Sequence, residues 1–279
     1  MHSIRTTLNA AVASLNLSSS SPLLDAEILL CQVLNRPRSY LRAWPDTKLN
    51  AVQLGAFSDL LKQRQHGHPI AYLTGIKEFW SREFIVTPDV LIPRPDTECL
   101  IEVCLALVQT QPRLRLIDLG TGSGIIAITL AAERPDASVF AADISASALA
   151  IAQLNAQRHH VNIQFFQSDW FTAIPVQAFD LVVSNPPYIA SDDDHLQQGD
   201  LRFEPQQALI AADQGLHDIN LLADKARHFL TPNGHLVIEH GYNQAESVQA
   251  IFTQHHYHAI QTINDLSGQP RVTFGCYPP

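Results

Sequence analysis

The chain has 279 residues, of which 46% are hydrophobic, and its formal net charge at pH 7 is −9. A chain of this length and composition buries a sizeable core, which excludes intrinsic disorder. The acidic balance disfavours direct nucleic-acid binding, and no apolar run reaches the roughly 18 residues that span a bilayer. Because the first residues also lack the apolar core of a secretory signal, we expect a cytoplasmic, monomeric protein without nucleic-acid or membrane partners.

The first 75 residues carry only helical patterns. A helix is predicted to begin at Ser21-Pro22, since proline is favoured in the first turn, and another over 50–65, where apolar residues recur at helical spacing. Aromatic and β-branched residues over 76–88 indicate a β-hairpin. We therefore predict a small all-helical domain at residues 1–75, a hairpin linker at 76–88 and a second domain at 89–279.

Helical and strand patterns alternate in the second domain. Asp96 is predicted to cap a helix over 97–109, and a further helix follows the glycine loop described below. Strands are predicted at 114–119, 138–142, 163–166, 179–184, 235–239, 257–262 and 272–274, with other helices at 146–158, at 216–229 and from 244. This alternation is typical of βαβ units, and it predicts an α/β, Rossmann-like sheet with helices on both faces.

A glycine loop follows the first of these strands. Gly120, Gly122 and Gly124 alternate with Thr121 and Ser123 directly before a helical run. Glycines at a strand-to-helix turn let the backbone approach a ligand beside the positive end of the helix, so we interpret residues 120–124 as a cofactor loop rather than only a tight turn. A dinucleotide fingerprint would have two residues between its second and third glycines, and the single residue here disfavours NAD.

Polar and aromatic residues follow the next two strands. Asp143 comes about twenty residues after the glycines, where a carboxylate can accept both hydroxyls of a ribose, although it can also cap the next helix. Asp169, Trp170 and Phe171 offer an acceptor and flat rings that can flank an adenine, or the two rings belong to the core. We predict that Asp143, Asp169 and Trp170 bind the cofactor.

The tetrapeptide Asn185, Pro186, Pro187 and Tyr188 follows the strand at 179–184. The prolines fix the backbone and donate no hydrogen bond, which leaves acceptors directed outward. The oxygens of Asn185 and Pro186 can accept both hydrogens of a planar NH₂ group while Tyr188 packs on it. The motif predicts a substrate-binding and catalytic site for an amide or amino nitrogen, the alternative being a proline-stiffened turn.

These motifs resemble the class I methyltransferases with an N-P-P-Y motif, and more specifically the peptide chain release factor glutamine N5-methyltransferases. The likeness extends over nearly the whole chain. It is carried by IPRPDTE at 92–98, DLGTGSG at 118–124, NPPY at 185–188, and residues 204–205, 208–209, 215–216 and 239–241.

The resemblance implies methyl transfer from S-adenosylmethionine, giving S-adenosylhomocysteine, to the glutamine of the Gly-Gly-Gln motif of bacterial class 1 release factors. This modification modulates translation termination. The glycine loop, Asp143 and Trp170 would hold the cofactor, Asn185 would border both ligands, and residues 185–188 would hold the glutamine. The helical domain would recognise the protein substrate.

Other functions remain open at this point. An adenine-N6 or other nucleic-acid methyltransferase also binds a planar NH₂ group through hydrogen-bond acceptors. The acidic net charge of the chain disfavours this function. A ribosomal-protein glutamine methyltransferase shares the chemistry, but the segment 93–98 favours a release factor. An NAD-dependent oxidoreductase is a further alternative, which the glycine spacing disfavours. The last alternative is a non-catalytic binding module that has kept the fold without the activity. No role is assigned to Arg94.

No metal site is predicted. The four cysteines, Cys31, Cys99, Cys104 and Cys276, show no C-x-x-C pairing. The histidine pairs at 159–160 and 255–256 lack a carboxylate or cysteine at ligand spacing, so we interpret them as solvated helix ends.

Overall fold

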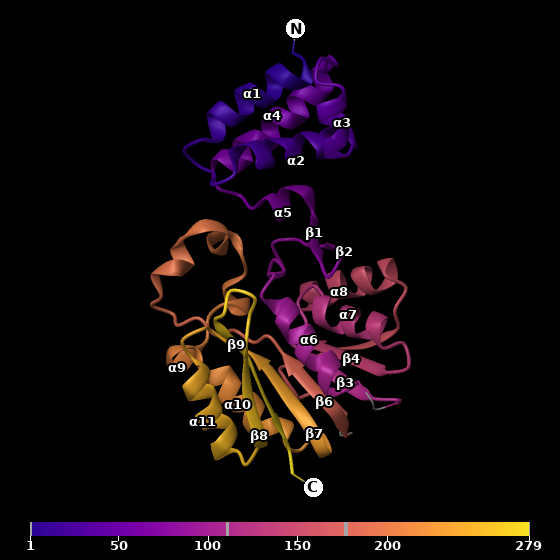
Figure 1. Cartoon of the computed structure of the whole chain (residues 1–279), viewed down its shortest axis with the longest axis vertical. Helices are drawn as coiled ribbons and strands as arrows, with labels where there is room; N and C mark the ends of the chain where they lie inside the picture. Colours follow the sequence, from indigo (N-terminus) through magenta and orange to yellow (C-terminus); the bar gives the residue numbers. More distant parts are fainter. Residues whose placement is uncertain (1, 110–111, 176–177, 279) are drawn as a thin grey trace. The chain divides into compact units, whose positions relative to one another are not determined.

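The computed structural model describes residues 2–109, 112–175 and 178–278, and it divides into two compact units (Figure 1). One unit comprises Met1–Ile76 with His195–Phe203, and the other comprises Lys77–Asp194 with Glu204–Pro279. The chain therefore leaves the second unit after Asp194 and returns to it at Glu204. No periodicity in the sequence indicated this excursion.

The first unit is all-helical. Its helices are α1 (Ile4–Leu15), α2 (Pro22–Leu34), α3 (Arg38–Ala43), α4 (Ala51–Gln65) and α5 (Ile70–Thr74). Reciprocal side-chain caps fix two helix starts, because Ser3 and Asn50 each accept from the backbone three residues on. The excursion belongs to this unit through ring contact, with the His68 and Phe203 centroids 4.5 Å apart.

A hairpin of β1 (Ile76–Phe79) and β2 (Arg82–Ile85) follows, and all of it except Ile76 belongs to the second unit. A seven-stranded sheet follows, in the order β5-β4-β3-β6-β7-β9-β8. Its strands are β3 (Arg115–Leu119), β4 (Ser138–Asp143), β5 (Ile163–Gln167), β6 (Phe179–Ser184), β7 (Leu230–Glu239), β8 (His258–Asn264) and β9 (Pro270–Cys276). The helices are α6 (Thr97–Leu107), α7 (Ile125–Glu133), α8 (Ala146–Arg158), α9 (Ala212–Gly215), α10 (His217–Ala226) and α11 (Ala245–Gln254).

Helices cover both faces of the sheet, as predicted. Successive strand residues point to opposite faces, so Leu116 packs in the cluster with α6 and α7 whereas Ile117 packs in the cluster with α10 and α11. Strands β3 to β7 pair in parallel, and β9 runs antiparallel between β7 and β8. The α/β, Rossmann-like fold is confirmed.

The start of α6 agrees with the prediction in position but not in its capping contact. Asp96 stands at the N-cap position before Thr97, but it has helical backbone angles and its side chain makes no cap hydrogen bond. The backbone already turns before this residue, since the Thr97 N–H donates to the carbonyl of Arg94 at 3.2 Å. The Asp96 carboxylate instead pairs with Arg271 on β9, at 3.4 Å.

A buried amide joins the hairpin to the glycine loop. Asn155, on α8, is completely buried. Its Oδ1 accepts from the Ile85 N–H at 2.7 Å, and its Nδ2 donates to the carbonyls of Ile85 at 3.0 Å and Ser123 at 2.8 Å. The helix therefore fixes two segments that are distant in sequence.

We expect Asn155→Ala to lower the free energy of unfolding by about 2–4 kcal/mol, because it removes three buried hydrogen bonds and leaves the Ile85 amide unpaired. Urea unfolding followed by circular dichroism measures the change. Asn162→Ala, at an exposed position, is the matched control and should change stability by less than about 0.5 kcal/mol. Equal stabilities for the two variants would contradict the bridging role.

Candidate active site

The predicted site residues follow the carboxyl ends of three adjacent parallel strands. The glycine loop follows β3, Asp143 ends β4 and Asn185 follows β6, and β3 pairs with both of the other strands. Ligands of open α/β sheets bind at such an edge, where the connections diverge. A cavity of about 360 Å³ lies there. Among the predicted residues it is lined by Gly120, Thr121, Gly122, Ser123, Asp143, Asp169, Trp170, Asn185 and Pro187.

The glycines of the loop adopt positive φ, and at Gly124 a side chain would also be obstructed by a close neighbour. Gly124 has φ of +85°, and a Cβ there would lie 2.8 Å from Cδ1 of Ile128. A Cβ on Gly120, where φ is +70°, would meet the Trp170 ring at 3.5 Å. Gly124 does not line the cavity, so its role in this structure is to start α7.

Asp118 begins the DLGTGSG motif on its strand side and has no predicted role of its own, but its side chain holds the glycine loop in place through hydrogen bonds. The carboxylate is completely buried, and its Oδ2 accepts from the Thr121 hydroxyl at 2.6 Å and the Ala127 N–H at 3.2 Å. Burial raises the pKa of Asp118 to about 7, although both hydrogen bonds lower it. The other oxygen, Oδ1, has no hydrogen-bond partner among the described residues.

The pKa of Asp118 leads to a pH-dependent stability. Between about pH 4 and pH 7 the folded protein keeps a proton that the unfolded chain releases, so the free energy of unfolding falls as pH rises through this window. Asp118→Asn, which cannot ionise and keeps an acceptor for Thr121, should therefore gain stability relative to the unsubstituted protein from pH 5 to pH 8. Urea unfolding at both pH values measures this gain, with the exposed Asp59→Asn as control. A difference that does not change with pH would contradict it.

Asp143, Asp169 and Trp170, which are also predicted to bind the cofactor, line the same cavity. Asp143 accepts from the Gly122 N–H at 2.8 Å and the Ser145 N–H at 2.9 Å, one on each oxygen. Burial raises its pKa. Asp169 is exposed at the cavity rim, and Trp170 adopts φ of +46°, held by the Ser168 hydroxyl on its carbonyl at 2.8 Å.

A cofactor with a ribose and a flat ring fits these residues. Each Asp143 oxygen bonded to one backbone N–H keeps a further lone pair for a hydroxyl. Gly120 and the Trp170 ring, which lie close to each other, both line the cavity and offer it a flat apolar surface. Apolar side chains of Ile126, Ile144 and Ala148 complete this wall.

The structure separates the members of the asparagine motif. Asn185 and Pro187 line the cavity, whereas Pro186 is buried and Tyr188 does not line it. The Tyr188 hydroxyl donates to Glu239 Oε1 at 3.4 Å, and burial raises the pKa of Tyr188 well above its usual value. Packing of the Tyr188 ring on a substrate stays a prediction.

The cavity also contains a group that sequence reasoning left unassigned. Arg94 lines it, and its guanidinium pairs with Glu204, whose side chain is fully buried. Glu204 also accepts from the Ile92 N–H at 3.0 Å. The ion pair thus fixes the 92–94 segment, one wall of the cavity, to the point where the chain returns from its excursion. Arg94 and Glu204 both lie in sequence motifs, at 92–98 and 204–205, but the sequence did not indicate that they form an ion pair.

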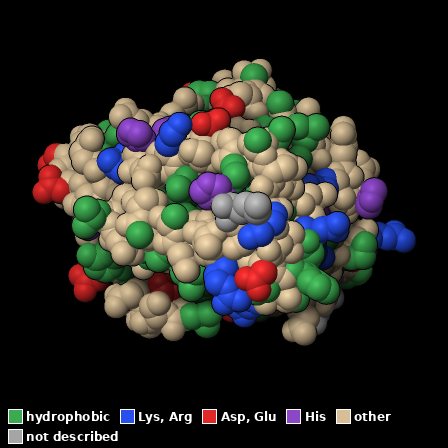
Figure 2. Space-filling view, turned by 90° about the horizontal axis from the view of Figure 1, so that it is seen from above, with side chains coloured by type: hydrophobic (Ala, Val, Ile, Leu, Met, Phe, Trp, Pro, Cys, Tyr) green, Lys and Arg blue, Asp and Glu red, His purple; other side chains and the backbone are tan. Residues whose placement is uncertain are grey.

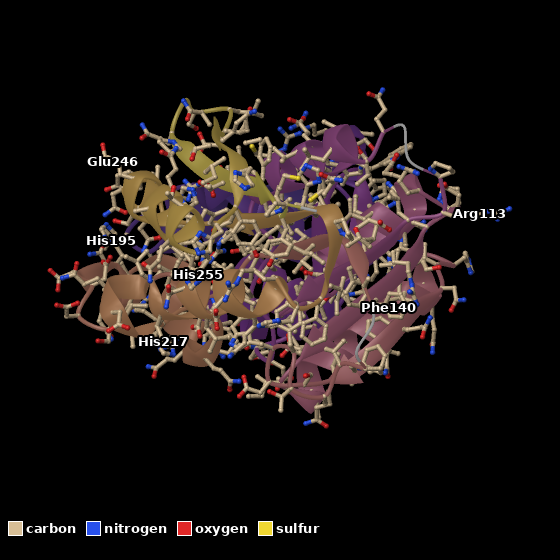
Figure 3. The ribbon with its side chains drawn as sticks, turned by 90° about the horizontal axis from the view of Figure 1, so that it is seen from below. Arg113, Phe140, His195, His217, Glu246 and His255 are labelled. Atoms are coloured by element: carbon tan, nitrogen blue, oxygen red, sulfur yellow. The ribbon has the colours of Figure 1, made fainter. Side chains whose placement is uncertain are left out.

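Histidines make ordinary contacts. His255, labelled in Figure 3, has Nε2 3.0 Å from Oδ1 of Asn220, and Nε2 of His159 lies 2.9 Å from the carbonyl of Glu83. Within residues 2–109, 112–175 and 178–278, no group of three or more His, Cys, Asp or Glu side chains is arranged to hold a metal ion.

Basic, acidic and hydrophobic side chains are interspersed on the face shown in Figure 2. None of the helices within the described part of the chain is long and apolar enough to cross a membrane.

Two family models match the chain. One, described as the PrmC N-terminal domain, matches residues 6–75, and the other, described as the methyltransferase small domain, matches residues 97–203. Their order along the chain follows that of the helical patterns and the βαβ units.

Curated relatives are similar over nearly the full length. The chain is 48% identical over 273 residues to a release factor glutamine methyltransferase of Salmonella typhimurium strain LT2, with 98% of each chain covered. It is 48% identical over 271 residues to the Escherichia coli K12 protein of the same name, with 97% of each chain covered. Among solved structures, a methyltransferase from Pyrococcus furiosus gives a TM-score of 0.54 at 14% identity, covering 80% of this chain and 100% of that one, which indicates a shared fold.

Proposed function

The chain belongs to the release factor glutamine methyltransferase family, and from that premise we propose that it methylates the N5 amide nitrogen of the glutamine in the Gly-Gly-Gln motif of class 1 peptide chain release factors. The methyl donor is S-adenosylmethionine and the second product is S-adenosylhomocysteine. The observation that carries this function is the position of Asn185, which lines the same cavity as the glycine loop and Asp143.

The residues of the cavity divide into two groups. Residues 120–123 of the glycine loop, Asp143, Asp169 and Trp170 line the cavity and would hold the cofactor. When bound, S-adenosylmethionine supplies an electrophilic methyl group attached to a positively charged sulfur. Asn185 lies where the chain leaves β6, and Thr97 and Arg94 lie beside it. This second group would receive the glutamine side chain.

Asn185 would activate the substrate by positioning it. A glutamine amide is a weak nucleophile, because its nitrogen lone pair is delocalised into the carbonyl. The oxygen of Asn185, which lines the cavity, would accept one amide hydrogen and favour the positive charge that develops on nitrogen. Pro186 is buried, and its carbonyl as the acceptor of the second hydrogen stays a prediction. The Asn185 contact would also orient the amide nitrogen toward the bound methyl donor.

The helical unit would recognise the folded release factor. Its surface exposes large apolar side chains, among them Leu17 and Trp44. We expect Trp44→Ala and Leu17→Ala to raise KM for an intact release factor several-fold and to leave KM for a short Gly-Gly-Gln peptide unchanged. Equal effects on both substrates would contradict recognition by this unit. The acidic charge supports a protein rather than a nucleic-acid substrate, and we propose a cytoplasmic monomer.

Methylation with a labelled cofactor tests the function. The enzyme should transfer label to a bacterial class 1 release factor, and mass spectrometry should place the added methyl on the glutamine of the Gly-Gly-Gln motif. A release factor with alanine in place of that glutamine is the matched control. Label on DNA, on RNA or on a ribosomal protein, with none on the release factor, would overturn the proposal.

A further inference from the structure

Gln244 stands at the N-cap position of α11 but does not cap the helix. Serine, threonine, asparagine and aspartate are the usual residues there, because a short side chain with an oxygen can accept from the first free N–H groups. The Gln244 side chain makes no such hydrogen bond, although only 8% of the residue is exposed. A buried carboxamide needs hydrogen-bond partners, so its contacts elsewhere show what it does.

The Gln244 amide joins three segments of the second unit that are distant in sequence. Its Oε1 accepts from the Gly241 N–H at 2.8 Å, in the turn after β7. Its Nε2 donates to the carbonyl of Tyr188 at 3.0 Å and to that of Gln214 at 3.2 Å. Because a backbone N–H only donates and a carbonyl only accepts, these partners allow one orientation of the amide and use both hydrogens of its NH₂ group.

Gln214 belongs to a turn that depends on its surroundings. Asp213, Gln214 and Gly215 have φ of +53°, +54° and +84°, and only the last is a glycine. A left-handed backbone is unfavourable for the other two residues, so neighbouring contacts have to hold it. The hydrogen bond from Gln244 to the Gln214 carbonyl is one such contact. It keeps Gly215 close to Tyr188, where an added Cβ would lie 2.6 Å from the carbonyl carbon.

The Tyr188 carbonyl is the last group of a stiff tetrapeptide. Pro186 and Pro187 have φ fixed by their rings, so few free backbone torsions separate this carbonyl from Asn185. The other end of the tetrapeptide follows β6, which pairs with β3 on one side and β7 on the other. A displacement of the Tyr188 carbonyl would therefore reach Asn185 instead of being absorbed between them.

We propose that Gln244 is a positioning residue, which holds the asparagine motif from its carboxyl-terminal end and so fixes Asn185 in the cavity. Gln244 does not line the cavity, and it acts through the Tyr188 carbonyl rather than by touching a ligand. The inference rests on the proposed function for its catalytic consequence. A positioning group that moves by about 1 Å can lower a rate about 10²-fold, so loss of these hydrogen bonds should be visible in kcat.

Two substitutions at Gln244 test the proposal. Gln244→Met keeps the length of the side chain and removes all three hydrogen bonds, whereas Gln244→Glu keeps an acceptor for Gly241 and presents a carboxylate to the two carbonyl oxygens. Per folded enzyme, both should lower kcat for release factor methylation about 10–100-fold, with KM and cofactor affinity within a few-fold of the unsubstituted values. Gln249→Met and Gln249→Glu, at an exposed position of α11, are the matched controls and should keep full kcat.

The pH profile of Gln244→Glu gives a readout that a merely structural role would not move. A protonated carboxyl regains one hydrogen for the Tyr188 carbonyl, and burial should raise its pKa above the usual value of about 4.3. The ratio of kcat in Gln244→Glu to kcat in Gln244→Met, per folded enzyme, should therefore rise several-fold as pH falls from about 8 to about 6. Both variants keep the titratable residues of the joined segments, whose effects cancel in the ratio: Tyr188, Asp213, Glu239, His240, Tyr242 and Glu246. Full kcat in either Gln244 variant, or a ratio that does not change with pH, would overturn the proposal.

Crystal structures separate failure of this inference from failure of the proposed function. Without any substrate, Gln244→Met should show the Tyr188 carbonyl and the Asn185 side chain displaced by about 1 Å from their places in the unsubstituted enzyme, and Gln249→Met should show no displacement. Displacement in an enzyme that does not methylate a release factor would reject the function and keep the positioning role. Methylation by the unsubstituted enzyme, with no displacement in Gln244→Met, would reject the positioning role alone.

Discussion

Asn185→Ala should lower kcat for methylation of a release factor by about 10²–10³-fold. The substitution removes one of the two acceptors expected to face the substrate NH₂ group, and losing one preorganised group of an electrostatic site typically has this effect. The affinity for S-adenosylmethionine should change much less, because the glycine loop and Asp143 line the cavity independently of Asn185. Rate measurements with saturating cofactor, together with calorimetric titration of the cofactor, give both values.

Asn162→Ala is the matched control for this experiment, since Asn162 is exposed between α8 and β5 and does not line the cavity. It should leave both kcat and cofactor affinity unchanged. If Asn185→Ala weakened cofactor binding as much as it lowered turnover, Asn185 would be a cofactor residue and its role toward the amide would be wrong.

Gly215→Ala should be among the most damaging single substitutions. Gly215 has φ of +84°, and an added Cβ would lie 2.6 Å from the carbonyl carbon of Tyr188 and 2.8 Å from Nε2 of Gln244. That nitrogen donates to the Tyr188 carbonyl at 3.0 Å, so the new methyl group would force apart the contact that holds the end of the asparagine motif. We expect the free energy of unfolding to fall by about 2–4 kcal/mol.

Gly215→Ala should also lower kcat, independently of its effect on stability. A displacement of about 1 Å at a positioning group can lower a rate about 10²-fold, and Tyr188 lies three residues after Asn185. Gly268→Ala is the matched control, because Gly268 has φ of +80° but open space around its Cα. Its free energy of unfolding should fall by only about 1–2 kcal/mol, the cost of a left-handed backbone for alanine, and it should keep full kcat. Similar losses in the two variants would show that strain alone, and not the contact with Tyr188, explains the effect.

Local sequence patterns predicted the parts of this fold that depend on neighbouring residues. Alternating periodicity gave the βαβ order, and the spacing of Gly120, Gly122 and Gly124 gave the loop that follows β3. The parallel pairing of β3 with β4 and β6 then brings Asp143 and Asn185 to the same edge. The carboxyl ends of neighbouring parallel strands lie at the same edge of a sheet. The strand order therefore suffices to bring the glycine loop, Asp143 and Asn185 to one cavity.

The remaining features depend on contacts between distant segments, which have no local signature. Asn155 reads as one more polar residue of a helix, yet it is buried and bonds a hairpin residue 70 positions away. Thr97 resembles an ordinary first-turn residue, yet it is buried and accepts a hydrogen bond from Asn185, which follows β6 and lies 88 positions away. The Asp96 side chain makes no cap hydrogen bond at its N-cap position for the same reason, since Arg271 on β9 provides a competing partner.

The excursion of His195–Phe203 changes how the two units can be separated. Because the chain crosses between the units near residue 76, after Asp194 and before Glu204, the helical unit is not a simple amino-terminal module. Removing residues 1–75 would deprive Phe203 of the His68 ring and Asp200 of Arg64. The segment His195–Phe203 also connects Tyr188 to Glu204, which pairs with Arg94 in the cavity. Deleting residues 1–75 would therefore perturb the active site as well as binding of the release factor. Recognition by the helical unit is therefore better dissected by surface substitutions than by truncation.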